Sequence, residues 1–234
     1  MSEILGACSC FGLLLAMGSY QLARMVNGRV GKEILNPLLF STLFCGAVLL
    51  LTGTEYDVFY ENGGKMLEFL LTPATICLAI PLYKQFELLK KNTAAVLAGC
   101  VAGVAAHTAG CVLMLVLFKM DAAEYISLLP KSITTAIGKG LSEELGGYPA
   151  ITTACIMLTG LFGAVTASPL LKLFGVTDPV SQGLAIGTSS HAAGTSRAVQ
   201  LGEIQGAASS LAIVVTGLLT VIAAPLFAKL VQIG

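Results

Sequence analysis

Long apolar runs separated by short polar stretches dominate the pattern of this chain of 234 residues. Crossing the hydrocarbon core of a bilayer takes about 20 apolar residues, and six runs reach or approach that length. None of them alternates polar and apolar positions as a membrane β-strand does, so each run predicts a helix. The six predicted spans are approximately Ile4–Val26, Leu35–Gly53, Met66–Tyr83, Thr93–Phe118, Ala150–Phe174 and Gly206–Val231.

Two further segments, about Ala122–Gly147 and Asp178–Gln205, contain too much glycine, hydroxyl and charge to be ordinary spans. Sliding the chain by 57 residues aligns them and the spans that follow. The matches include Ser132 with Ser189, Ala150 with Ala207 and Thr159-Gly160-Leu161 with Thr216-Gly217-Leu218. We interpret this as a weak internal repeat, in which a broken helical element precedes a full span. Irregular backbone at membrane depth must be satisfied by protein or by water, and paired broken segments point to a transport site.

The predicted fold is therefore an all-α polytopic membrane protein with about six full transmembrane helices and two broken or re-entrant helical elements. We expect residues 1–234 to form a single integral membrane domain. Residues 1–120 would be an N-terminal four-helix part, and residues 121–234 would hold the two repeats. Crossing elements would make the repeats parallel and re-entrant elements would make them inverted, and the sequence leaves both open.

Composition supports this class and excludes others. Only 11% of the residues are charged and the mean hydropathy is +0.86, whereas soluble proteins carry roughly 25% charged residues. The 13 basic and 13 acidic residues balance, so no nucleic-acid partner is expected. The sequence has no GxSxG elbow, P-loop or HExxH motif, and its two histidines and scattered cysteines form no zinc set. We expect neither an enzyme nor a cofactor or metal site.

Candidate binding residues gather in the two broken segments. Lys131 and Arg197 are the cations that we expect to pair with an anionic substrate, because arginine holds a carboxylate bidentately and lysine acts as a point charge. Hydroxyls beside them would hydrogen-bond the keto or hydroxyl oxygen of a small acid. These hydroxyls are Ser132, Thr134, Thr135, Ser189, Ser190, Thr195 and Ser196. The alternative is that both cations lie at the membrane interface and snorkel.

A proton could be carried by His191, because the ordinary pKa of histidine lies near physiological pH. The alternative is a neutral His191 that bonds a neighbouring carbonyl or hydroxyl. Glu203 is the second candidate for proton coupling, or it simply faces water. His107 stands alone in a span of small residues and is predicted to be a packing residue.

Several motifs resemble the LrgB/CidB family, from about Asn36 to the end of the chain. The similar segments are Asn36-Pro37-Leu38-Leu39, the stretch from Pro73-Ala74-Thr75 to Pro81-Leu82-Tyr83-Lys84-Gln85, Leu129-Pro130-Lys131-Ser132-Ile133-Thr134-Thr135, Gly146-Gly147-Tyr148-Pro149, Ser190-His191-Ala192-Ala193-Gly194-Thr195 and Gly206-Ala207-Ala208-Ser209-Ser210-Leu211. The chain departs from the pattern at Ala136, where the family often has proline, and at Ser196, where it often has alanine.

The resemblance implies one of two functions. Family members are described as holin-like or antiholin-like proteins that control murein hydrolase export and autolysis, and also as transporters of small carboxylates such as pyruvate. Plastid relatives move glycolate and glycerate. The resemblance also implies a location in the cell inner (plasma) membrane, a small LrgA/CidA-type membrane protein as partner, and a homo-oligomer. From the residues we favour a carrier of 2-hydroxy or 2-oxo monocarboxylates that works by alternating access. A wide pore would gain little from two cations and a cluster of hydroxyls.

Overall fold

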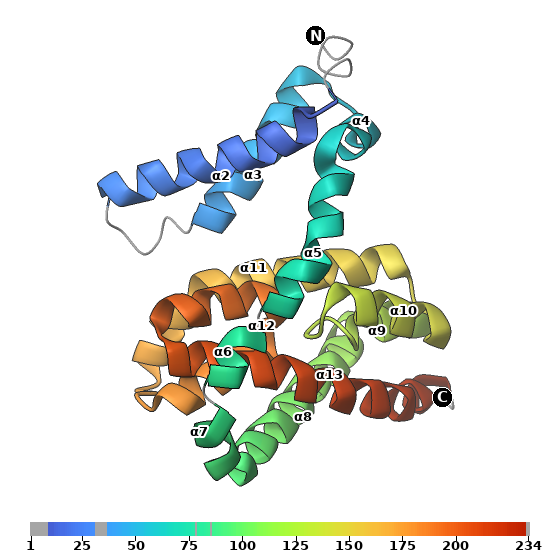
Figure 1. Cartoon of the computed structure of the whole chain (residues 1–234). Helices are drawn as coiled ribbons and strands as arrows, with labels where there is room; N and C mark the ends of the chain where they lie inside the picture. Colours follow the sequence, from blue (N-terminus) through green and yellow to red (C-terminus); the bar gives the residue numbers. More distant parts are fainter. Residues whose placement is uncertain (1–8, 31–36, 78, 85, 233–234) are drawn as a thin grey trace. The chain divides into compact units, whose positions relative to one another are not determined.

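The computed structural model describes residues 9–30, 37–77, 79–84 and 86–232, and every regular element in these ranges is a helix (Figure 1). This confirms the all-α class. The chain forms two compact units, within residues 1–77 and residues 78–234, and each is described by itself. The proposed division at residue 120 stays a prediction.

A glycine-rich turn packs closely on the first described helix of the first unit. The helices of this unit are α2 (Phe11–Val30), α3 (Pro37–Thr52), α4 (Tyr56–Phe59), the π-helical turn η1 (Tyr60–Gly64) and α5 (Lys65–Cys77). Gly63 adopts a φ of 120°, a region that glycine enters without steric penalty. A Cβ at Gly63 would lie 2.6 Å from the backbone nitrogen of Leu13, so only glycine allows η1 to pack this closely on α2.

The second unit is built around three long apolar helices. Its elements are α6 (Ala79–Lys84), α7 (Phe86–Lys91), α8 (Thr93–Phe118), α9 (Ala122–Leu128), α10 (Thr135–Leu145), α11 (Pro149–Leu173), α12 (Pro179–Leu201) and α13 (Glu203–Gln232). Helices α8, α11 and α13 are long and apolar enough to cross a membrane, and they coincide with the last three predicted spans. Large apolar side chains on them are exposed, among them Phe118, Phe162 and Ile222, as a lipid-facing surface requires.

The count of six spans is not confirmed. Helix α3 has 16 residues, which is short for a full crossing. The predicted spans Ile4–Val26, Leu35–Gly53 and Met66–Tyr83 each include residues outside the described ranges.

Two helical elements of the second unit are interrupted. Between α9 and α10 the chain leaves the helix over residues 129–134, which we call the first interruption. Helix α12 is continuous in outline, but Ser190 (φ −136°, ψ 15°) and His191 (φ 42°, ψ −140°) leave the helical region inside it. We call residues 190–191 the second interruption.

The two interrupted elements begin alike. The Asp121 side chain accepts a hydrogen bond from the Glu124 backbone N–H at the start of α9. The Asp178 side chain does the same for Ser181 at the start of α12. Asp121 and Asp178 are 57 residues apart (178 − 121), and so are Thr134 and His191 (191 − 134), where the interruptions end. The structural offset therefore equals the shift that aligns the sequence.

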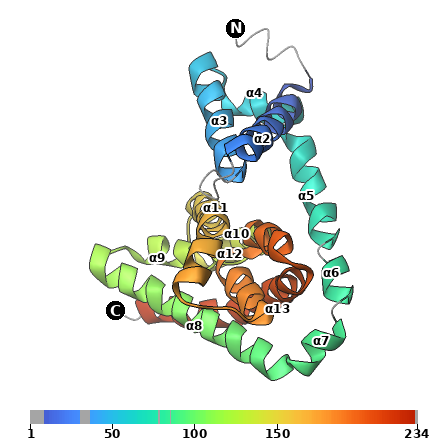
Figure 2. The ribbon, with the colours of Figure 1, turned by 90° about the vertical axis from the view of Figure 1, so that its left-hand side faces the viewer.

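Helix α12 packs on both α11 and α13 (Figure 2). Two glycines bring α12 against the backbone of α13. A Cβ at Gly187 would lie 2.5 Å from the carbonyl oxygen of Ser209, and a Cβ at Gly183 would overlap the carbonyl oxygen of Gln205. This close approach places the second interruption inside the bundle formed by the long helices.

Candidate functional site

The second interruption fits into a notch on α11. Gly160 and Gly163 form this notch, since a Cβ at Gly163 would overlap the Ser190 side chain and one at Gly160 would lie 2.6 Å from His191 Cε1. The His191 ring is only 7% exposed, and its Nε2 lies 2.9 Å from the carbonyl oxygen of Ile156. The histidine therefore bonds a backbone carbonyl, as one of the two alternatives anticipated.

A hydroxyl pair fixes the half of α12 that follows the second interruption. Thr195 Oγ1 donates to the carbonyl oxygen of His191 at 2.8 Å and lies 2.7 Å from Ser209 Oγ on α13. Both side chains are fully buried. The Ser189 hydroxyl bonds its own helix at Ala185 O, 2.7 Å away, and lies 3.0 Å from Ser190 Oγ. Of these predicted ligands, Ser189 is exposed and the others are buried.

The first interruption is anchored on α8. Pro130 lies in the loop that leaves the helix and is buried. Ser132 is 7% exposed, and its Oγ lies 3.2 Å from His107 Nδ1. The other ring nitrogen of His107, Nε2, lies 2.7 Å from the carbonyl oxygen of Leu129. One histidine of α8 thus contacts both ends of the loop around Lys131.

Lys131 is the half-buried cation of this loop. The loop packs beside Ile156 of α11, because a Cβ at Gly138 would lie 2.6 Å from Ile156 Cδ1 and 3.2 Å from the carbonyl oxygen of Pro130. No carboxylate among the described residues forms an ion pair with it. A half-buried lysine without such a partner is available to an anion.

Arg197 belongs to the second half of α12 and bonds α11 at Ser168. Its Nε and Nη2 donate to Ser168 Oγ at 3.2 and 2.9 Å, and its Nη1 donates to Gln200 Oε1 at 3.1 Å. Ser168 and Ile156 are 12 residues apart (168 − 156), which corresponds to about 18 Å of helix rise. Arg197 therefore contacts α11 near its end, whereas the first interruption packs nearer the middle of that helix. That the two cations share one anion stays a prediction.

The other predicted site residues lie outside these contacts. Thr134 and Thr135 are half-buried at the start of α10, and the Thr134 side chain makes no capping bond. Ser196 is exposed and donates to Ala192 O at 3.2 Å within its own helix. Glu203 is exposed in the first turn of α13, so the structure does not place it beside His191.

Sequence reasoning missed the part played by His107, which it treated as a packing residue. The ring instead bonds the first interruption through both nitrogens. A polar side chain in an apolar span is costly unless it has a partner, and this was the available signal. Among the residues that the structure describes, no three His, Cys, Asp or Glu side chains gather as metal ligands.

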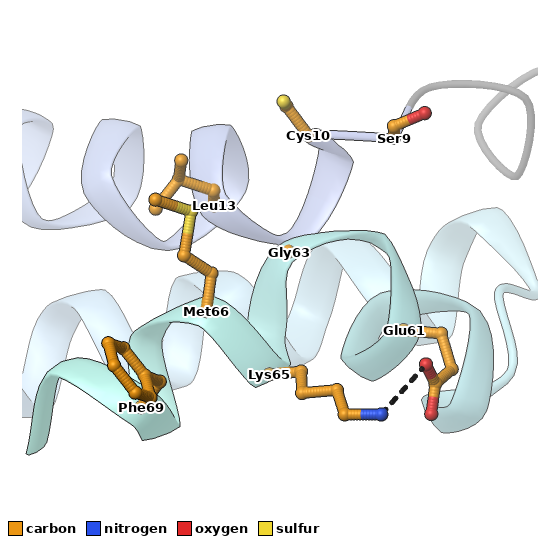
Figure 3. Close-up of a pocket in the computed structure, with 8 residues that line it drawn as sticks. All are labelled: Ser9, Cys10, Leu13, Glu61, Gly63, Lys65, Met66 and Phe69. Atoms are coloured by element: carbon orange, nitrogen blue, oxygen red, sulfur yellow. Dashed lines mark ion pairs between the residues drawn. The ribbon is translucent and has the colours of Figure 1, made fainter.

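The first unit contains a pocket of its own (Figure 3). Its volume is about 380 Å³, and it lies between the start of α2 and the η1–α5 segment. The lining residues are Ser9, Cys10, Leu13, Glu61, Gly63, Lys65, Met66 and Phe69. Lys65 Nζ lies 3.6 Å from Glu61 Oε2, so its cation is already paired. None of the predicted site residues lines this pocket.

Long apolar helices surrounding two interrupted, polar helices define a polytopic helical membrane protein. The chain belongs to the LrgB-like family, which matches residues 16–230. It is 35% identical to a protein from Bacillus mycoides (strain KBAB4) named "Antiholin-like protein LrgB", over 93% of this chain and 94% of the relative. Relatives of the same name from Bacillus cereus (strain B4264) and Bacillus anthracis (strain CDC 684 / NRRL 3495) match with the same identity and coverage. No solved structure matches the chain.

Proposed function

We propose that this chain is an antiholin-like protein of the inner (plasma) membrane that controls murein hydrolase export and thereby autolysis. The names of its relatives support this function over the carrier that the residues alone favour. We further propose a small LrgA/CidA-type membrane protein and further copies of this chain as its partners in the bilayer.

The packing of the second unit bears on how such control would work. A folded hydrolase is tens of ångströms across, whereas glycines bring α12 against the backbone of α13. A passage for a folded enzyme between these helices would require the pair to separate. We therefore infer that the folded hydrolase does not pass between these helices. The chain would control export indirectly, by acting on a solute or a partner much smaller than the hydrolase.

The second candidate function is transport of small monocarboxylates such as pyruvate, lactate or glycolate by alternating access. One observation favours it: the two interruptions lie against the middle of long apolar helices. His107 is near the centre of α8, and Gly160 and Gly163 are near the centre of α11. The middle of a spanning helix lies near the bilayer centre, where irregular backbone is tolerated only beside protein or water.

In this candidate the anion binds first at Lys131, with Ser132, Thr134 and Thr135 nearby. Arg197 and Ser196 would form a separate contact point at the end of α11. His191 and Glu203 remain proposed proton carriers. Replacing His191 by Gln keeps an amide donor for the Ile156 carbonyl but removes the titration. We expect this variant to transport with a flattened pH profile.

The experiment that separates the two candidates combines a cell assay with a liposome assay. Deletion of the gene should change the rate of detergent-induced autolysis. In liposomes, the antiholin candidate without transport predicts no saturable uptake of labelled pyruvate, lactate or glycolate. The carrier candidate predicts uptake that falls at least about tenfold in Lys131→Ala, the effect of losing one charge-assisted hydrogen bond.

Lys139→Ala is the matched control, because Lys139 is an exposed cation on α10. Unchanged autolysis in the deletion strain would contradict the antiholin function. Equal uptake by Lys131→Ala and the unmodified protein would remove Lys131 from the site.

A further inference from the structure

The chain contains two histidines, and both bond a backbone carbonyl through Nε2 at an interruption. His191 belongs to the second interruption and bonds outward to Ile156 of α11, at 2.9 Å. His107 belongs to α8 and bonds inward to Leu129 of the first interruption, at 2.7 Å. Each contact therefore joins an interruption to a long helix. The histidine lies on the interruption in one contact and on the long helix in the other.

The Leu129 carbonyl is a group that the first interruption leaves without its helical partner. In a continuous helix the N–H of Ile133 would donate to Leu129 O. Here it donates to Pro130 O at 3.2 Å. A buried carbonyl without a donor destabilises the fold, and His107 supplies that donor.

The bonding pattern assigns the protonation of the His107 ring. Leu129 O can only accept, so Nε2 carries the hydrogen. Nδ1 then accepts from the hydroxyl of Ser132, 3.2 Å away. Lys131 lies between Leu129 and Ser132 in the chain, so the two bonds fix the loop on both sides of the lysine.

Ile156 connects the two interruptions. Its side chain is fully buried, and its Cδ1 would lie 2.6 Å from a Cβ at Gly138 of α10, directly after the first interruption. Its carbonyl oxygen accepts the hydrogen bond from His191. The same residue of α11 therefore contacts the elements that carry both interruptions.

We propose that His107 is a positioning residue, which holds the first interruption against α8 and so sets the place of Lys131, as His191 holds the second interruption against α11. That Lys131 then binds an anion rests on the proposed function. That His107 holds the loop against α8 does not rest on it, because this part of the proposal concerns only the position of the loop.

Two amide variants test the positioning. His107→Gln keeps an N–H donor near the position of Nε2, whereas the shorter His107→Asn places its amide near Nδ1 and does not reach Leu129 O. Cys111 is a native reporter: it is fully buried, and its Sγ lies 3.6 Å from Leu128 O and 3.7 Å from His107 Nε2. Release of the loop would uncover this thiol.

The measurement is the rate of N-ethylmaleimide addition to each cysteine in the full chain in detergent, read by peptide mass spectrometry. Cys100 is the internal standard, because it is equally buried on α8 but packs against α12 and α13. Thr108→Ala is the matched control, since Thr108 is buried beside His107 and bonds only Val104 of its own helix.

We expect the Cys111 rate, relative to Cys100, to rise about tenfold in His107→Asn, because one buried hydrogen bond is worth roughly that factor. It should stay within about twofold of the unmodified protein in His107→Gln and Thr108→Ala. Equal rates in the Asn and Gln variants, or a parallel rise of Cys100, would overturn the proposal. Alkylation needs no transport, so a failed uptake assay leaves this result intact.

Discussion

Both interruptions break a helix inside the second unit, but different contacts stabilise the break in each case. The first takes six residues, 129–134, and uses proline and local turns such as the bond from the Lys131 N–H to Leu128 O. The second takes two residues and holds His191 at a φ of 42°, a conformation that costs a non-glycine residue about 1–3 kcal/mol. The backbone of the first interruption is shaped by its own proline and local turns, with His107 of α8 as its anchor. The backbone of the second interruption is held in its strained conformation by packing against α11 and α13.

The surroundings of the second interruption explain how such a conformation persists. The glycine notch on α11, the Ile156 carbonyl and the Thr195–Ser209 pair all constrain it. Strain of this kind survives only where neighbouring contacts over-determine it. Substitutions in neighbouring helices should therefore affect the second interruption more strongly than the first.

The largest expected effect comes from adding one methyl group beside each interruption. Gly163→Ala should destabilise the protein by about 3 kcal/mol, because its Cβ would overlap the Ser190 side chain next to the backbone. Gly138→Ala should cost less, about 1 kcal/mol, since its nearest obstacle is the terminal methyl of Ile156 and the backbone oxygen of Pro130 lies further away, at 3.2 Å. Thermal unfolding of the detergent-solubilised variants, followed by size-exclusion fluorescence, measures both.

Gly110→Ala serves as the control for this pair, because no atom lies near its added Cβ and alanine favours a helix. Equal losses for Gly163→Ala and Gly138→Ala would remove the contrast between the two interruptions.

A smaller difference in stability is expected between two hydroxyl–hydroxyl hydrogen bonds. One joins α11 to α10, after the first interruption, and the other joins α13 to α12, after the second. Thr152 on α11 donates to Ser142 of α10 at 2.6 Å. Ser209, 57 residues later (209 − 152), bonds Thr195 of α12. Thr152→Val should cost about 2 kcal/mol, and Ser209→Ala about 1 kcal/mol because Thr195 keeps its bond to His191 O. The same unfolding assay ranks them, with exposed Ser196→Ala as control, and the reverse order would contradict the bonding described.

One pair of positions should respond with opposite signs. The hydroxyl of Tyr125 on α9 is buried and has no hydrogen-bond partner in the described structure. Its counterpart Gln182 (182 − 125 = 57) donates to Val176 O and accepts from Gln205. Tyr125→Phe should raise stability by up to about 1 kcal/mol, and Gln182→Met should lower it by about the same amount. A loss of stability in Tyr125→Phe would reveal a bound polar partner, such as a water molecule.

The smallest expected effect is on the stability of the protein at acidic pH. The Ser181 hydroxyl, and then its backbone N–H, lower the pKa of the Asp178 carboxyl, which lies outside the apolar spans. A lowered pKa stabilises the fold above the ordinary pKa of aspartate, about 4, and this contribution disappears as the pH falls through the folded-state value. Asp178→Asn should therefore flatten the stability profile below about pH 4, as measured by thermal unfolding across that pH range. Identical profiles for Asp178→Asn and the unmodified protein would contradict this cap.

The sequence was most informative where local chemistry decides the structure. Hydrophobic run length located α8, α11 and α13 to within a few residues, and Pro130 marked the first interruption. The second interruption could be assigned to its segment but not to His191, because a positive φ at histidine arises from packing and leaves no local pattern. The notch of Gly160 and Gly163 was equally hidden among 26 glycines.

The site was less predictable than the fold. That Lys131 and Arg197 share one anion stays a prediction: the first interruption packs beside Ile156, whereas Arg197 bonds Ser168, about 18 Å further along α11. The sequence shows that both cations lie in polar motifs. It does not show the position of each cation along α11, because that position depends on tertiary packing, such as that of α12 against α11 and α13. The bond from His107 to Leu129 O joins residues 22 positions apart, and no pattern in one sequence records such a pair.

The aspartates that start α9 and α12 bear on biogenesis. Each gives its half of the second unit its own helix initiation signal, made from residues within three positions of one another. A nascent chain emerging from the ribosome could therefore begin α9 before Asp178 has been synthesised. The segment that begins with α9 would then be in the membrane before the segment that begins with α12 is inserted, and the second segment could pack against it.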